Sequence, residues 1–170
     1  NVIDPMVEAV IADDTIQHVG IIATKTTIAS GTYQEKFSRR KPGLQYSALA
    51  TPLLAGMIEE GFYNNNISHA VLSRYLSDPT LNNIDALVLA CTHYPLIKNE
   101  ISEYYGYRVK IFDSAQVVAA KLKWVLQKEQ LDAHTKPGSD VFYVSDYTDS
   151  FEHTTRVFYG STVKLIQHKV

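Results

Sequence analysis

The sequence places its most reactive side chains in one short segment, Cys91-Thr92-His93-Tyr94-Pro95. Cys91 follows an apolar run and lies four residues before Pro95, and proline is typical of the first turn of a helix. Backbone amides at a helix N-terminus stabilise a thiolate, so this position predicts a thiol pKa below its ordinary value of about 8.5. Cys91 is therefore a candidate catalytic residue. The alternative is an inert side chain that packs at the end of a strand.

The two residues after Cys91 are candidates for binding or catalysis. Thr92 offers a hydroxyl and an amide that suit a substrate carboxylate, or it can bond its own backbone as a turn residue. His93 can act as an acid, a base or a hydrogen-bond donor to a substrate, or it can be structural. The single cysteine and the scattered histidines show no metal-ligand spacing, so we expect no metal site.

A second group of candidates lies upstream of this segment. The turn from Thr24 to Thr27 opens a helical segment, and its amides can bind an anion. The turn lacks the glycines of a nucleotide-binding loop, and its threonines can also serve only as a helix cap. Glu59 lies near a predicted helix end, where its carboxylate can either reach a cleft or be solvated.

Short apolar runs and amphipathic segments alternate along the chain and indicate the elements that hold these residues. The predicted strands are 18–23, 44–50, 84–90, 109–113, 141–145 and 163–168, and the predicted helices are 5–12, 28–37, 53–60, 68–76, 95–104, 115–128 and 150–158. Such alternation predicts an α/β fold with an open, mostly parallel sheet and flanking helices. Ligands bind such sheets at the carboxyl ends of strands, which selects the loops 24–27 and 91–95.

The composition excludes several classes of protein. Sixteen basic and eighteen acidic residues leave a net charge of −2, which argues against a dedicated nucleic-acid or membrane-binding surface. One cysteine cannot form an internal disulfide, and no segment has the character of a signal or a membrane span, so we expect a cytoplasmic protein. The start reads as a strand end at 1–3, with Asp4 as an N-cap before Pro5, and we expect a truncated or processed chain.

Four segments resemble the glutamate racemases of the Asp/Glu racemase superfamily. The segment 22–33 is similar to the family's Gly-Thr-x-Ala-Thr-x-x-Ser-x-x-Tyr stretch, with Ala23 in place of the usual glycine and Thr26 in place of the usual alanine. Residues 57–62 resemble its Val-Glu-Glu-Gly-aromatic segment, and 111–115 resemble its Asp-Ser-Gly/Ala turn. Residues 87–96 are nearly identical to its second cysteine motif.

The resemblance implies a racemase that needs neither a metal nor another cofactor. Two cysteines lie on opposite faces of the substrate α-carbon; one thiolate removes the α-proton and the other thiol delivers a proton. Cys91 matches the second cysteine, which acts on L-glutamate, and His93 matches a residue that assists it. Thr92, Thr24 and Thr27 match substrate-binding or cleft residues. Glu59 matches an acidic residue near the site and is also a candidate for substrate binding. The D-glutamate product serves peptidoglycan synthesis, and thereby cell wall biogenesis and cell shape.

The resemblance also implies a division of the chain. Residues 1–113 correspond to the second racemase lobe, and 114–170 correspond to the segment that completes the N-terminal lobe. The family's first cysteine lies upstream of Asn1, so we expect this chain to be inactive alone and the intact enzyme to be a homodimer. Aspartate racemases carry Cys-Thr-Glu, and His93 therefore favours glutamate. A non-catalytic amino-acid-binding module is the remaining alternative.

Overall fold

The computed structural model describes residues 1–131, 138, 140–161 and 163–168. The chain divides into two compact units, Asn1–Leu126 and Gln127–Val170. The first unit contains the strands β1 (His18–Ala23), β2 (Gln45–Ala50), β3 (Ala86–Leu89) and β4 (Lys110–Asp113). Its helices are α1 (Ile3–Ile11), α2 (Lys25–Ala29), α3 (Thr32–Arg40), α4 (Pro52–Glu59), α5 (Asn66–Leu76), α6 (Lys98–Tyr104) and most of α7 (Ser114–Lys128), with 3₁₀ turns η1 (Pro79–Leu81) and η2 (Tyr94–Ile97).

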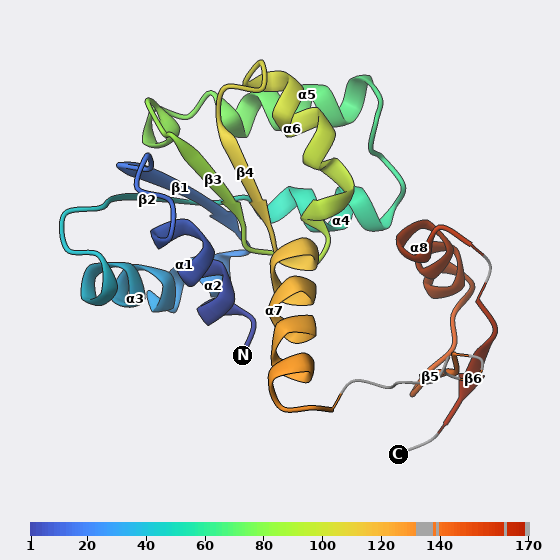
Figure 1. Cartoon of the computed structure of the whole chain (residues 1–170). Helices are drawn as coiled ribbons and strands as arrows, with labels where there is room; N and C mark the ends of the chain where they lie inside the picture. The colour runs from blue at the N-terminus through green and yellow to red at the C-terminus, as the bar shows by residue number, and fades with distance from the viewer. Residues whose placement is uncertain (132–137, 139, 162, 169–170) are drawn as a thin grey trace. The chain divides into compact units, whose positions relative to one another are not determined.

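The four strands of the first unit form one parallel sheet in the order β2-β1-β3-β4 (Figure 1). Ile22 of β1 is paired with Leu49 of β2 and with Leu89 of β3. Leu89 is also paired with Asp113 of β4, so all four strands end at the same edge. The parallel sheet with flanking helices confirms the predicted α/β class.

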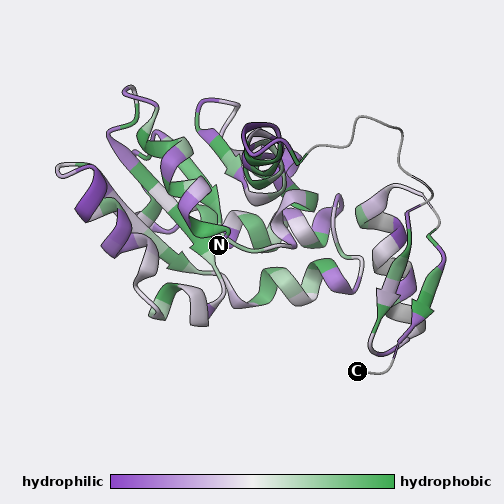
Figure 2. Ribbon diagram, turned by 60° about the horizontal axis from the view of Figure 1, so that its bottom comes forward, coloured by the Kyte–Doolittle hydropathy of each residue, from purple (hydrophilic) through white to green (hydrophobic). Residues whose placement is uncertain are grey.

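Helices cover both faces of this sheet, and each face has its own apolar core. Successive side chains on a strand point to opposite faces, so Val19 and Ile21 of β1 pack with α1 and α3. Ile22 of the same strand packs instead with α4, α5 and α6. Because both of its faces are covered, β3 is apolar and buried at all four residues. Figure 2 shows green, hydrophobic residues in the interior of the sheet, with purple, hydrophilic residues on the outer helices.

The start of the chain differs from the prediction. Residues 1–3 do not end a strand, because α1 begins at Ile3, and Asp4 lies inside its first turn instead of capping it. The Asn1 side chain accepts hydrogen bonds from the amides of Ile3 and Asp4 and so takes the capping role. The Asp4 carboxylate is then available to α3, where it pairs with Lys36 at 2.8 Å and with Arg40 at 3.1 Å.

Two predicted helices are each broken into a pair of shorter elements. The segment 28–37 is divided between α2 and α3 at Gly31, whose φ of +64° is a left-handed conformation that favours glycine. The segment 95–104 begins as the 3₁₀ turn η2 and becomes regular helix only at Lys98. Each break lies close to a candidate site loop, the first near 24–27 and the second near 91–95. As a result, the helices next to these loops, α2 and α6, are short.

The second unit contains β5 (Phe142–Val144), α8 (Asp149–Tyr159) and β6 (Leu165–Gln167), close to their predicted ranges. The two strands pair in parallel, and α8 connects them. Thr148 caps α8 through the amide of Phe151. Between the predicted helix 115–128 and the predicted strand 141–145, the polar composition of residues 132–139 indicates a loop, and these residues lie almost entirely outside the described part of the chain. The division of the intact enzyme at residue 113 stays a prediction.

Candidate active site

The candidate loops meet at the carboxyl edge of the sheet. Cys91 lies two residues beyond Leu89, and Thr24 lies two residues beyond Ile22, the residue paired with Leu89. The amide of Ala90 donates to Ile22 O at 3.0 Å, which extends the pairing of the two strands to the start of the Cys91 loop. Cys91 thus has the predicted position at the end of a central strand.

Cys91, His93 and Glu59 form a contiguous array at this edge. Cys91 Sγ lies 3.7 Å from His93 Nδ1. His93 Nε2 lies 2.9 Å from Glu59 Oε1, at the last residue of α4. The imidazole therefore bridges a half-buried thiol and a carboxylate, and an Nε2–H donated to Glu59 leaves Nδ1 as the acceptor that faces the sulfur.

The environment of Cys91 corrects the predicted direction of its pKa. Burial raises the pKa of the thiol above its ordinary value, and the nearby Glu59 carboxylate acts in the same direction. Hydrogen bonds from the amides of His93, Tyr94 and Thr92 oppose this effect but do not outweigh it. The sequence-based prediction considered only the backbone amides. It did not include the loss of hydration of the buried thiol, which disfavours the charged thiolate.

The three candidate threonines differ in what they contact. Thr24 caps α2, with its hydroxyl 3.4 Å from the Thr27 amide and 3.1 Å from the Thr27 hydroxyl. The contact between these two threonines is the helix cap that the sequence allowed as an alternative to anion binding. A binding role for them stays a prediction. Thr92 is exposed and lines an apolar hollow of about 430 Å³ with Val2, Ser114 and the start of α7.

Two buried polar contacts near the site were missed by the sequence interpretation. Thr51, directly after β2, and Tyr94, at the start of η2, are both fully buried and bonded to each other at 2.7 Å. The buried Asp113 accepts a bond of 2.6 Å from Lys98 at the start of α6. Thr51 directly follows the predicted strand 44–50, and Asp113 ends the predicted strand 109–113, but no spacing in the sequence linked either residue to its partner.

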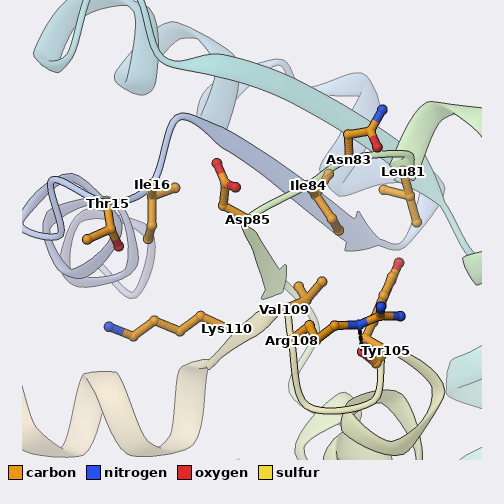
Figure 3. A pocket seen from close by; sticks show the side chains of 10 residues that line it. All are labelled: Thr15, Ile16, Leu81, Asn83, Ile84, Asp85, Tyr105, Arg108, Val109 and Lys110. Carbon is orange, nitrogen blue, oxygen red and sulfur yellow. Dashed lines mark hydrogen bonds between the residues drawn. The ribbon is translucent and has the colours of Figure 1, made fainter.

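A different hollow opens at the opposite, amino-terminal edge of the sheet (Figure 3). It has a volume of about 560 Å³, but its charged side chains are used to hold the fold. The Asp85 carboxylate accepts bonds from the amides of Gln17 and His18, and Lys110 pairs with Asp13 at 2.7 Å. No cysteine or histidine among the described residues lines this hollow, so it lacks an array like that of Cys91, His93 and Glu59.

Neither a metal cluster nor a membrane-spanning helix is found in the described part of the chain. No group of three or more histidine, cysteine, aspartate or glutamate side chains is placed there to hold a metal ion. No helix there combines the length and the apolar character that a membrane crossing requires. The expectation that the protein uses no metal stays a prediction.

The chain is similar to glutamate racemases in sequence and in fold. It is 34% identical to glutamate racemase of Geobacter metallireducens over 160 residues, which cover 94% of this chain and 59% of that protein. For the Chlorobaculum parvum enzyme the identity is 36% over 147 residues, with coverages of 84% and 53%. The structure of Francisella tularensis glutamate racemase in complex with D-glutamate superimposes with a TM-score of 0.87 at 32% identity, covering 99% of this chain and 62% of that one. No family model matches the chain.

The chain spans between 53% and 62% of the length of these three proteins.

Proposed function

This chain belongs with the glutamate racemases by homology and fold, and we propose that it forms part of an enzyme that interconverts L- and D-glutamate. The array of Cys91, His93 and Glu59 at the end of β3 carries the proposal, because it supplies a thiol next to a group that can take its proton. The Francisella tularensis relative was solved with D-glutamate, which supports glutamate as the substrate.

In the proposed reaction Cys91 acts on L-glutamate as a base. His93 accepts the thiol proton at Nδ1, and Glu59 holds the imidazole in the tautomer that can do so. The thiolate then takes the α-proton; the Cα–H bond breaks, an S–H bond forms, and the electron pair stays on the substrate carbanion. A second thiol returns a proton to the opposite face of the α-carbon.

That second thiol must come from outside these 170 residues, since the chain contains one cysteine. We therefore propose that the chain assayed by itself does not racemise glutamate. Thr92, Thr24 and Thr27 are the proposed substrate-binding residues, and Thr92 is the most accessible of them. We further propose a cytoplasmic homodimer that supplies D-glutamate for peptidoglycan, with no nucleic-acid or membrane partner.

The test is an assay of the intact enzyme in deuterated water with L-glutamate and, separately, with L-aspartate. The proposal expects D-glutamate that carries solvent deuterium at the α-carbon, without any added cofactor. Turnover of aspartate alone would identify an aspartate racemase. Absence of turnover with either substrate would leave the amino-acid-binding module as the better description.

A further inference from the structure

A buried pair of side chains fixes the Cys91 turn to the neighbouring strands. Thr51 and Tyr94 are both 0% exposed, and their hydroxyl oxygens lie 2.7 Å apart. The Tyr94 hydroxyl donates to the Thr51 hydroxyl, which in turn donates to Ala23 O at 3.3 Å, while Thr51 O lies 3.1 Å from the Tyr94 hydroxyl oxygen. The ends of β1 and β2 and the turn after β3 are therefore joined by one hydrogen-bonded chain.

This chain of hydrogen bonds is shielded from water. Inside a protein, hydrogen bonds gain strength from the low local dielectric, and a buried hydroxyl that loses its partner is costly. The Tyr94 ring belongs to the apolar core under α4 and α6, so the side chain has no solvated alternative position. The pair consequently holds the Tyr94 backbone at one place relative to Ala23 and Thr51.

The fixed backbone belongs to the turn that carries the thiol. The Tyr94 amide donates to Cys91 O at 3.3 Å, and in the same turn His93 Nδ1 lies 3.7 Å from Cys91 Sγ. The amides of Thr92, His93 and Tyr94 act to lower the pKa of this thiol. Each of these donors stabilises the thiolate only while it is directed at the sulfur. We propose that Thr51 and Tyr94 are positioning residues, which keep the amides of the Cys91 turn directed at the sulfur.

This inference rests on the proposed function for its biological meaning, but it can be tested without turnover. The chain has one cysteine, so the rate of alkylation by iodoacetamide reports on Cys91 alone. The variants Tyr94→Phe and Thr51→Val remove one hydroxyl each with little change of volume. Losing part of a hydrogen bond to a charged group should raise the apparent thiol pKa by about one unit, which slows alkylation about tenfold at a fixed pH below the pKa.

Tyr105 provides a matched control. Burial raises the pKa of both Tyr94 and Tyr105 to about 12. The buried Tyr105 hydroxyl, however, has no hydrogen-bond partner within the described chain, and it lies in the hollow at the opposite edge (Figure 3). Tyr105→Phe should therefore leave the alkylation profile of Cys91 unchanged. Thr51→Ser, which keeps the hydroxyl, should restore the profile that Thr51→Val loses.

The inference is overturned if Tyr94→Phe and Thr51→Val have the wild-type profile, or if Tyr105→Phe shifts it equally. Circular dichroism identifies any variant that does not fold. If Tyr94→Phe does not fold, the alkylation profiles of Thr51→Val and Thr51→Ser test the inference by themselves. In the intact enzyme, Tyr94→Phe should lower kcat with L-glutamate about tenfold with little change in KM. Loss of activity in Cys91→Ser tests the proposed function separately, because the alkylation profile requires no racemisation.

Discussion

The half-buried thiol of Cys91 is subject to two opposing effects, loss of hydration and hydrogen bonding from its own turn. With a pKa above its ordinary value, the thiol stays protonated at neutral pH. Such a group readily delivers a proton, but it needs an acceptor before it can remove one. His93, at 3.7 Å from the sulfur and held by Glu59, is the acceptor that the structure offers.

Replacement of Cys91 by serine in the intact enzyme should reduce racemisation of L-glutamate by at least about a thousandfold. A hydroxyl has nearly the size of a thiol but is far too weakly acidic to exchange protons in this way. Its half-buried position should accept serine without loss of the fold, and a thermal melt provides the control. Retained turnover in a folded Cys91→Ser enzyme would show that the cysteine only packs.

At the scale of elements, the buried Glu100 joins α6 to the start of α5. Its carboxylate accepts bonds from the Ser68 hydroxyl at 2.6 Å and from the Asn64 amide at 2.8 Å. The Ser68 hydroxyl also accepts from the Asn65 amide and completes the capping box of α5. One hydroxyl thus serves both the helix start and a buried carboxylate.

We expect Ser68→Ala to lower the free energy of unfolding by about 1–3 kcal/mol, since it leaves a buried acceptor short of a partner. Ser73→Ala is the matched control, because Ser73 lies exposed on the same helix. Alanine is the better helix former, so the control should be neutral or slightly stabilising. Urea titrations of both variants give the comparison. Equal effects would mean that the Glu100 contact contributes nothing measurable.

The contact between α1 and α3 should give the protein a specific sensitivity to acid. The hydrogen bond from Lys36, followed by that from Asn1, lowers the pKa of Asp4 to about 2. Because the folded pKa lies below the unfolded value of about 3.9, this stabilisation is complete above pH 4 and is lost as the pH falls toward 2.

Asp4→Asn should therefore flatten the loss of stability between about pH 4 and pH 2. Urea midpoints measured at several pH values across this window provide the test. Asp14→Asn is a suitable control, because the Asp14 side chain is fully exposed and its pairing with Lys41 is long, at 3.7 Å. Identical slopes for the wild type and Asp4→Asn would contradict the assignment, as would a flattened slope in Asp14→Asn.

The sequence was sufficient for most of the elements and insufficient for the contacts between them. The strand at 18–23 was predicted without error, because the five apolar or small residues that follow His18 are typical of a buried strand. The break at Gly31 depends on one backbone angle, which a helical pattern does not reveal. The bond between Thr51 and Tyr94 joins residues 43 positions apart and requires the order of strands in the sheet. The pKa of Cys91 likewise depends on burial, which spacing alone cannot give.

At the scale of the whole molecule, the two units differ in how much apolar surface they bury. All four residues of β3 are buried, within cores on both faces of the sheet. Within the described part of the second unit, Val163 is the one buried apolar residue, whereas Tyr143, Phe158 and Ile166 are exposed. Exposed apolar side chains at this density are typical of a surface that packs against another element. They support the proposal that residues 114–170 complete a lobe formed by other parts of the intact enzyme.

Hydrogen exchange on the 170-residue chain should therefore separate the two units. Opening of β3 disrupts both cores of the first unit, so the amides of Ala86 to Leu89 should exchange near the rate set by global unfolding. The two-stranded sheet of β5 and β6 has little buried apolar surface, and its amides at 142–144 and 165–167 should exchange faster by orders of magnitude. The α7 amides should exchange at a rate between those of β3 and β5, because this helix has no fully buried residue. Equal protection of β3 and β5 would show that the second unit is stabilised in this chain, and the proposed division at residue 113 would then be wrong.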